Sequence, residues 1–296
     1  MLLISGEYSM KIILKAAAIA AALMGTLGAS AIAGDFDGAK LEKILAAQPE
    51  MVRARYQYRH PKETLEFLGI APGMTVADTL AGAYYSRILI PYLGDEGKLI
   101  GVSYSLEHRA IDYGDNADRM ERFKAWPEKY KADAMGWRGD GKTGIDAFLF
   151  DGMPDEMKGT VDAFLLFRAM HHLNKYEDNG QRRTKAFQNI WDALKPGGIV
   201  GIVQHRAPAD ISDEWARGFK GYIKQAPLIA AMEAFGFEFV ASSEINANPK
   251  DKPTEADYVW RLPPRLVGSE EGSEKRAALQ AIGESDRMTL KFRKPE

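Results

Sequence analysis

The sequence contains no cysteine among its 296 residues. This absence excludes disulfides, thiolate metal sites and thiol nucleophiles. An excess of charge of one sign is also lacking, because 39 basic side chains are balanced by 41 acidic ones. A nucleic-acid partner is therefore not expected. Internal repeats and low-complexity tracts are absent too, and the length is sufficient for one large domain with a substantial core.

The only candidate for a membrane segment is an apolar run near the N-terminus. It follows Met10, a second possible start, and two lysines, and it ends in Ala31-Ile32-Ala33. A charged, an apolar and a small-residue part in this order are typical of a secretory signal, so we predict a signal peptide over residues 1–33. We expect export to the periplasm and no membrane span after cleavage, with an uncleaved anchor as the alternative.

Residues 75–107 have the plan of a βαβ nucleotide-binding half. An apolar run (76–80) enters the turn Ala81-Gly82-Ala83, a helical segment follows, and a second apolar run covers residues 98–102. Such a turn usually carries three glycines, and an acidic residue usually ends the second strand. Here Gly82 remains, Leu80 and Tyr84 flank it, and Ser103 stands where the acid is expected.

Hydrophobic periodicity predicts the remaining elements. Helices are predicted over 37–47, 61–68, 183–194 and 225–235, with two more around Trp126. Strands are predicted over 145–150, 161–167, 199–203, 237–242 and 287–293. Strands that alternate with helices predict a doubly wound, mostly parallel α/β sheet of seven strands. We expect a helical arm (34–70) and a main domain (71–296). Residues 246–286 form a segment that is too long for an ordinary loop, so we predict a functional flap there.

Several segments resemble a known family. Leu194-Lys195-Pro196-Gly197-Gly198-Ile199 resembles the helix-to-strand turn of class I S-adenosylmethionine-dependent methyltransferases, and residues 161–173 resemble their fourth strand and the segment after it. Residues 58–61, 204–208, 259–265 and 288–295 resemble a group of predicted exported methyltransferases. The resemblance covers about residues 50–296. It implies a Rossmann-like methyltransferase fold with an antiparallel last strand, S-adenosylmethionine as cofactor, and methyl transfer to an unknown small molecule.

The resemblance implies that Asp78 and Gly82 lie on the cofactor loop and that Asp151 lies beside the adenine. Tyr84, Ser103 and Arg168 are further candidate cofactor-binding residues, because they lie in the same turn or follow the ends of strands at the same edge of the sheet. Leu80, Tyr84 and Ser103 depart from the family pattern. Loss of the ribose carboxylate at Ser103 is expected to cost about 1.5–3 kcal/mol of donor binding. An exported binding or scaffolding protein that has lost the donor site is therefore the alternative function.

Three residues that follow the fourth and fifth strands are candidate catalytic residues. His171 is expected either to act as a general base or to cap and pack, and we expect packing for His172. His205 directly follows a buried strand and is expected near the crevice. Arg206 is expected to bind a substrate carboxylate or phosphate, or else to form an ion pair with the flap. No metal site is expected, because cysteine and His-x-x-x-His spacing are both absent.

Overall fold

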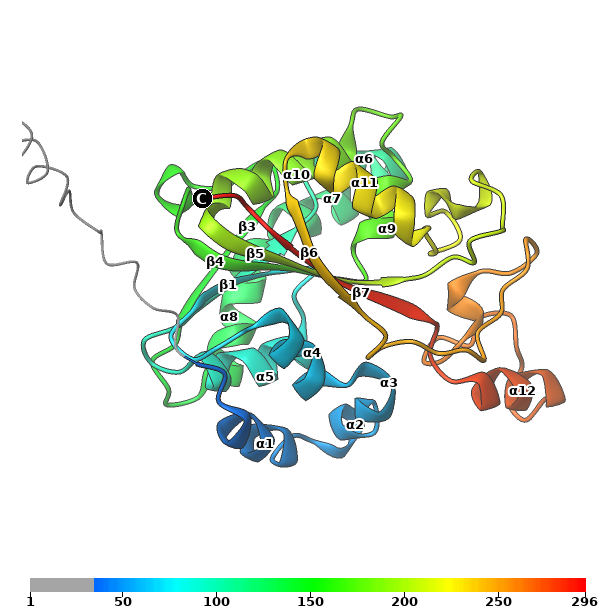
Figure 1. The fold of residues 1–296 in the computed structure, drawn as a ribbon, viewed down its shortest axis with the longest axis horizontal. Coiled ribbons are helices and arrows are strands. Elements are labelled where there is room, and N and C mark those ends of the chain that lie inside the picture. The colour runs from blue at the N-terminus through cyan, green and yellow to red at the C-terminus, as the bar shows by residue number, and fades with distance from the viewer. Residues whose placement is uncertain (1–34) are drawn as a thin grey trace, which may run out of the picture. The chain divides into compact units, whose positions relative to one another are not determined.

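The computed structural model describes residues 35–296, so the predicted signal peptide and its cleavage site lie outside the described residues. A seven-stranded sheet forms the centre, with the order β3-β2-β1-β4-β5-β7-β6 (Figure 1). Strands β1 to β5 are parallel, and β7 pairs antiparallel with both β5 and β6. The strands are β1 (Thr75–Thr79), β2 (Lys98–Ser103), β3 (Gly144–Leu149), β4 (Val161–Phe167), β5 (Leu194–His205), β6 (Glu238–Ser243) and β7 (Arg287–Arg293). The predicted doubly wound sheet and its antiparallel last strand are confirmed.

Helices cover both faces of the sheet because successive strand side chains point to opposite sides. Leu165 of β4 packs in the cluster with helices α1, α4, α5 and α8, whereas Phe164 and Leu166 pack in the cluster with α9, α10 and α11. The helices are α1 (Gly38–Ala46), α2 (Glu50–Arg53), α3 (Tyr56–Arg59), α4 (Pro61–Leu68), α5 (Ala83–Leu93), α6 (Leu106–Tyr113), α7 (Ala117–Lys124), α8 (Trp126–Arg138), α9 (Met170–Asn174), α10 (Arg182–Ala193), α11 (Gln225–Phe235) and α12 (Glu274–Ile282).

Close packing of α8 on the sheet depends on a glycine within β2. A Cβ atom at Gly101 would lie 2.4 Å from Cε1 of Tyr130, which is itself buried. Tyr130 in turn shares a hydrogen bond of 2.9 Å with Ser86 of α5. The glycine therefore lets one aromatic side chain join the sheet to two helices.

Two local predictions need correction. The polar segment after β2 forms three helices and not two, because Ser105 and Asn116 each cap a separate helix by accepting the backbone N–H of His108 and Arg119. The expected turn at Lys195-Pro196-Gly197-Gly198 lies inside β5 instead, where Gly197 has a φ of +74° and the pairing with β4 shifts register.

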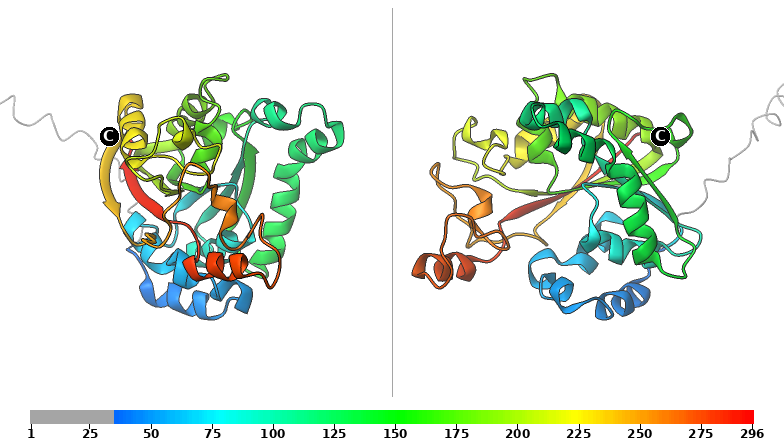
Figure 2. Two further views of the ribbon diagram at one scale, coloured as in Figure 1. Left: turned by 90° about the vertical axis from the view of Figure 1, so that its right-hand side faces the viewer. Right: turned by 180° about the vertical axis from the view of Figure 1, so that it is seen from behind.

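Residues 246–286 form an insertion between β6 and β7, and we refer to them as the insertion. Figure 2 shows it in orange and red beside the body of the domain. It contains α12 and a small core of Leu262, Leu266 and Leu279. Its packed interior explains how a long segment between strands keeps a defined course.

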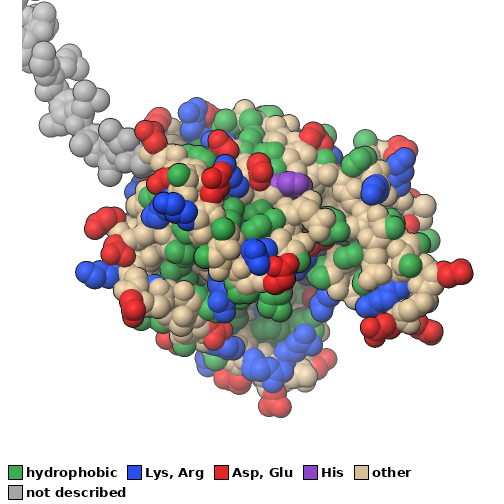
Figure 3. Space-filling model, turned by 90° about the horizontal axis from the view of Figure 1, so that it is seen from below, with side chains coloured by type: hydrophobic (Ala, Val, Ile, Leu, Met, Phe, Trp, Pro, Cys, Tyr) green, Lys and Arg blue, Asp and Glu red, His purple; other side chains and the backbone are tan. Residues whose placement is uncertain are grey.

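The surface carries both signs of charge. On the face seen in Figure 3, acidic and basic side chains are interspersed. Among residues 35–296, no helix is both long enough and apolar enough to cross a membrane.

Candidate functional site

Four parallel strands end at one edge of the sheet and bring the predicted site residues together. The ends of β1 and β2 lie beside each other, and β4 and β5 follow on the other side of β1. The chain passes from β1 to β2 on one side of β1, and from β4 to β5 on the opposite side of β4. The direction in which strands are added to the sheet therefore reverses between β1 and β4. Ligands of open α/β sheets bind outside the carboxyl ends of the strands at such a point.

The end of β1 carries two buried polar atoms without partners. Asp78 is 3% exposed, and neither its Oδ1 atom nor Oγ1 of Thr79 has a hydrogen-bond partner among the described residues. Burial raises the pKa of Asp78 to about 8, and the nearby Arg168 only partly opposes this shift. Because buried polar atoms are nearly always hydrogen-bonded, these two atoms are available to a polar group bound at this edge.

The turn after β1 keeps the backbone course of a glycine-rich loop. Leu80 has a φ of +56°, a left-handed conformation that glycine adopts without strain. A Cβ atom on Gly82 would meet only the carbonyl oxygen of Leu80, at 3.9 Å, so space in front of this residue is open. Helix α5 begins directly after Gly82 and points its first N–H groups toward this space. The departure at Leu80 therefore changes the side chain and not the shape of the turn.

Tyr84 contacts the N-terminal arm. The guanidinium carbon of Arg59 lies 4.4 Å from the centre of its ring, and its ring meets Tyr85 edge-on at 4.9 Å. The ring packs with the cluster that contains α1, α4 and α5. Its hydroxyl group is buried without a partner.

The end of β2 differs most from a nucleoside site. Oγ of Ser103 lies 3.3 Å from Nη2 of Arg109, so a positive group occupies the place next to the missing carboxylate. Tyr104 is buried, and its hydroxyl donates to the carbonyl oxygen of Ala169 at 2.8 Å. Its ring also packs on His108 and His172, at centroid distances of 4.5 and 5.6 Å. This aromatic layer joins the end of β2 to the segment after β4.

Asp151 lies apart from these groups, after β3. It is exposed, and its Oδ2 accepts the backbone N–H of Leu106 at 3.2 Å. It lines a cavity of about 200 Å³ together with Ser105, Phe150 and Asn189. The cavity lies between the end of β3, α6 and α10.

The histidines after β4 and β5 form a buried cluster whose rings are tilted against one another. The rings of His171 and His172 lie 3.9 Å apart, and the ring of His205 lies 5.6 Å from that of His171. Burial lowers the pKa of His171 to about 4 and lowers the pKa of the other two as well. Nδ1 of His171 lies 3.3 Å from Oε1 of Gln204, and its Nε2 is buried without a partner. His171 therefore combines a fixed ring with one free nitrogen.

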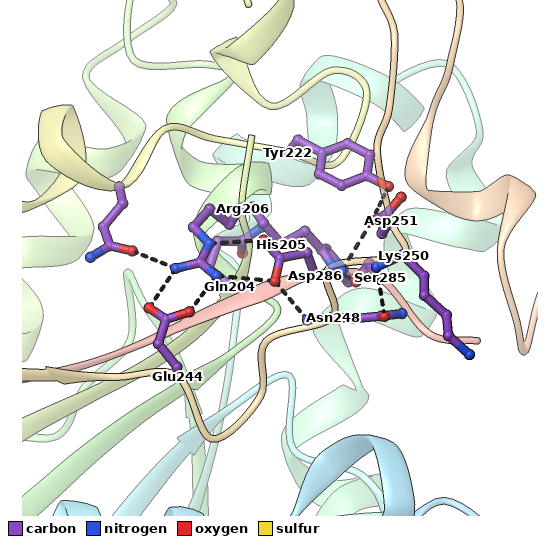
Figure 4. Close-up of polar contacts among 11 residues, drawn as sticks. Gln204, His205, Arg206, Tyr222, Glu244, Asn248, Lys250, Asp251, Ser285 and Asp286 are labelled. Carbon is purple, nitrogen blue, oxygen red and sulfur yellow. Dashed lines mark hydrogen bonds and ion pairs between the residues drawn. The ribbon is translucent and has the colours of Figure 1, made fainter. Parts of the chain in front are cut away.

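His205 and Arg206 both contact the insertion (Figure 4). Nδ1 of His205 lies 2.5 Å from Oγ of Ser285. Arg206 donates two hydrogen bonds to Asp286, at 2.8 and 3.1 Å, and two to Glu244, at 2.7 and 2.6 Å. These four bonds occupy the guanidinium group of Arg206. Of the two roles expected for Arg206, the structure therefore shows the ion pair with the insertion, through Asp286.

Arg168 lies on the wall of a cavity at the same edge of the sheet. It lines a space of about 170 Å³ between the ends of β4 and β5 and the insertion. Arg59, Glu284, Ser285 and Arg287 belong to the same region, and sequence reasoning did not select them as site residues. Their separation along the chain gives no spacing signal; only folding brings residues near 59, 168 and 285 together.

Within residues 35–296, no group of three or more histidine, aspartate or glutamate side chains is arranged to hold a metal ion. The polar groups instead fit part of a nucleoside-containing donor. The open turn at Gly82 and the unpartnered atoms of Asp78 and Thr79 fit its amino-acid end, whereas Ser103 lacks the carboxylate for its ribose.

Comparison with protein-family models finds no match for this chain, and comparison with curated proteins finds none either.

Solved structures do match. A SAM-dependent methyltransferase from Aquifex aeolicus is 18% identical, with 71% of this chain and 94% of that chain covered and a TM-score of 0.43. The geranyl diphosphate C-methyltransferase from Streptomyces coelicolor A3(2), in complex with Mg²⁺, geranyl diphosphate and S-adenosyl-L-homocysteine, is 14% identical, with 88% and 89% covered and a TM-score of 0.46. The [4+2]-cyclase SpnF is 15% identical, with 80% of each chain covered and a TM-score of 0.48. The seven-stranded sheet of this chain, mostly parallel with an antiparallel β7 and helices on both faces, is a Rossmann-like α/β fold.

Proposed function

We propose that the protein transfers a methyl group from S-adenosylmethionine to a small-molecule acceptor at the carboxyl ends of β1 and β4. One observation carries the proposal: Asp78 and Thr79, at the end of β1 and directly before the open turn at Gly82, hold buried polar atoms that have no partner among the described residues. A ligand at the turn would supply these missing partners.

The donor would be held by the turn and by the start of α5. Asp78 and Thr79 would receive its polar groups, and the absence of a side chain at Gly82 lets a ligand approach the backbone. When bound, the donor supplies an activated methyl group, so the protein has mainly to position the acceptor. The missing carboxylate at Ser103 predicts a donor affinity lower by about tenfold to a hundredfold than a complete site would give.

His171 is the best placed residue for moving a proton. Its ring is fixed by Gln204, its Nε2 has no partner, and its lowered pKa keeps it neutral at pH 7. A neutral imidazole nitrogen can accept a proton from an acceptor hydroxyl or amine. The His171 residue is 3% exposed.

Calorimetry with S-adenosylhomocysteine tests the donor site. We expect the wild-type protein to bind, and Gly82→Val to lose about tenfold or more in affinity, because the new side chain fills the space in front of the turn. The matched control is Gly136→Val in α8, where an added Cβ meets nothing within 4 Å. Absence of binding in the wild type, or an equal loss in both variants, would contradict the donor site.

A second candidate is a binding protein on the same fold that has lost the donor site. The contact between Ser103 and Arg109 and the bond from Tyr104 to Ala169 favour it, because both occupy the nucleoside side of the edge. On this alternative, the protein binds a small molecule and neither S-adenosylmethionine nor its product. The same titration separates the two candidates.

A further inference from the structure

The cavity beside Arg168 has an unusual lining. It measures about 170 Å³, and three arginines (Arg168, Arg265 and Arg287) contribute to its wall. Trp260 and Leu262 of the insertion supply apolar surface. Since one water molecule takes about 30 Å³ of liquid, the space equals that of about five or six waters. It is therefore large enough for a small organic molecule, and we refer to it as the arginine cavity.

The charges around the arginine cavity do not balance. Arg55, Arg59 and Arg287 each pair with the single carboxylate of Glu284, and Arg168 lies near the same group. Burial alone would raise the pKa of Glu284. The neighbouring arginines instead lower this pKa to about 2, so the Glu284 carboxylate is ionised. Burial and the neighbouring Arg59 and Arg287 lower the pKa of Arg168 to about 9, which leaves it charged at pH 7. The guanidinium groups of Arg55, Arg59, Arg168 and Arg287 and the carboxylate of Glu284 leave this cluster with a net charge of +3, to which Arg265 on the cavity wall adds a further positive charge.

Several guanidinium donors in this group have nothing to bind. Arg168 is partly exposed toward the cavity, and among the described residues no partner forms a hydrogen bond or an ion pair with its side chain. Arg59 and Arg287 are each 3% exposed, and Nη2 of the first and Nε of the second are buried without partners. Uncompensated buried charge is costly unless an opposite charge joins it.

The backbone at Arg168 supports a role in binding. Arg168 has a φ of +58°, which is a left-handed conformation for a residue with a side chain. Such conformations cost free energy and cluster at ligand sites, where the surrounding structure maintains them. Arg168 also follows β4 directly, at the edge where the turn of β1 lies.

We propose that the arginine cavity binds a small organic oxyanion, with Arg168 as its main contact. A guanidinium group recognises the two oxygens of a carboxylate or phosphate side by side, and the apolar wall accommodates the organic part. If the proposed function holds, this anion is the methyl acceptor, which makes the acceptor an organic acid or phosphate ester.

Anion binding is measured by calorimetry without any donor, using phenylacetate and inorganic phosphate as probes. We expect binding to the wild type, a loss of about tenfold to a hundredfold in Arg168→Gln, and a smaller loss in Arg168→Lys, which keeps the charge. The control is Arg122→Gln, an exposed arginine of α7 with the same change of charge. Preference for phenylacetate assigns a carboxylate, and preference for phosphate assigns a phosphate ester.

Three results would overturn the inference. Failure of both probes to bind would remove the anion site, and equal affinity of the wild type and a folded Arg168→Gln variant would remove Arg168 from it. Competition between phenylacetate and S-adenosylhomocysteine would assign the arginines to the donor's own carboxylate and not to an acceptor. Anion binding in a protein that fails to bind S-adenosylhomocysteine would contradict the proposed function and leave the anion site intact.

Discussion

At Leu80, a left-handed backbone conformation occurs where glycine would be expected. For a residue with a side chain this costs roughly 1–2 kcal/mol. The Leu80 side chain packs against the large core cluster on one face of the sheet, and this burial offsets the strain. The loop thus keeps its shape with a residue that sequence comparison alone would regard as a defect.

Ser103 provides the residue-level test of the donor site. In Ser103→Asp, the new carboxylate is expected to pair with Arg109, whose Nη2 already lies 3.3 Å from the serine oxygen. Affinity for S-adenosylhomocysteine should therefore change little in this variant. The double variant Ser103→Asp/Arg109→Gln frees the carboxylate and should bind about tenfold more tightly than the wild type.

Calorimetry measures both variants, and Arg109→Gln alone serves as the control. Equal affinities of the single and double variants would contradict the idea that Arg109 occupies the ribose side. A double variant no tighter than Arg109→Gln would show that this edge does not bind a ribose.

At the scale of elements, Glu284 joins the N-terminal arm to the insertion. Its carboxylate contacts Arg55 and Arg59, which lie beside and within α3, and Arg287 at the start of β7. The acid and two of its partners are 3% exposed. This one carboxylate therefore holds three separate parts of the chain together.

Glu284→Gln should destabilise the fold by about 3–5 kcal/mol, because it leaves buried guanidinium groups without their only counter-charge. Urea unfolding measures the change. Glu271→Gln is the matched control, since Glu271 is exposed on the same insertion. A loss below about 1 kcal/mol, comparable to a surface ion pair, would contradict this role.

At the scale of the whole molecule, stability should be greatest near pH 6.5. Burial lowers the pKa of His108 and His171 to about 4 and also lowers the pKa of His172 and His205. The contribution of these histidines to the free energy of unfolding is present above the unfolded pKa of about 6.5. It is lost as the pH falls toward 4, because the unfolded chain then binds protons that the folded protein does not. For His171 alone, the loss is about 3 kcal/mol.

Asp78 gives stability a pH dependence of the opposite sign. Its pKa is raised from 3.8 to about 8, so its contribution is present below the unfolded value and is lost as the pH rises through 8. Urea unfolding between pH 4 and pH 9, expressed as the free energy of unfolding, should show a maximum, and Asp78→Asn should abolish the alkaline decline. A wild-type curve that rises steadily above about pH 6.5 would contradict the assignment.

We further propose that the protein is exported. Cleavage after Ala33 predicts that the mature chain begins at Gly34. Fractionation of cells that express the chain from Met10, with N-terminal sequencing of the product, tests both points. Retention of the intact chain in the cytoplasm would contradict them.

The course of the chain was largely predictable. Alternating and continuous apolar runs identified β4, β7 and α11 with the bounds that the structure has. One error occurred where a single polar side chain decides the outcome, at Asn116, which starts a separate helix. A capping side chain is polar and does not change the spacing of apolar residues, so hydrophobic periodicity did not detect it.

Sequence by itself determined the fold class and the edge of the sheet where polar residues gather, because hydrophobic period and turn residues act over short distances along the chain. Tertiary structure alone decided which arginine is available for a ligand. Arg206 is occupied by Asp286 and Glu244, whereas Arg168 faces the cavity without a partner. Pairing of this kind depends on residues that are far apart in the chain, and their positions follow only from the packing of the insertion and the arm around the sheet.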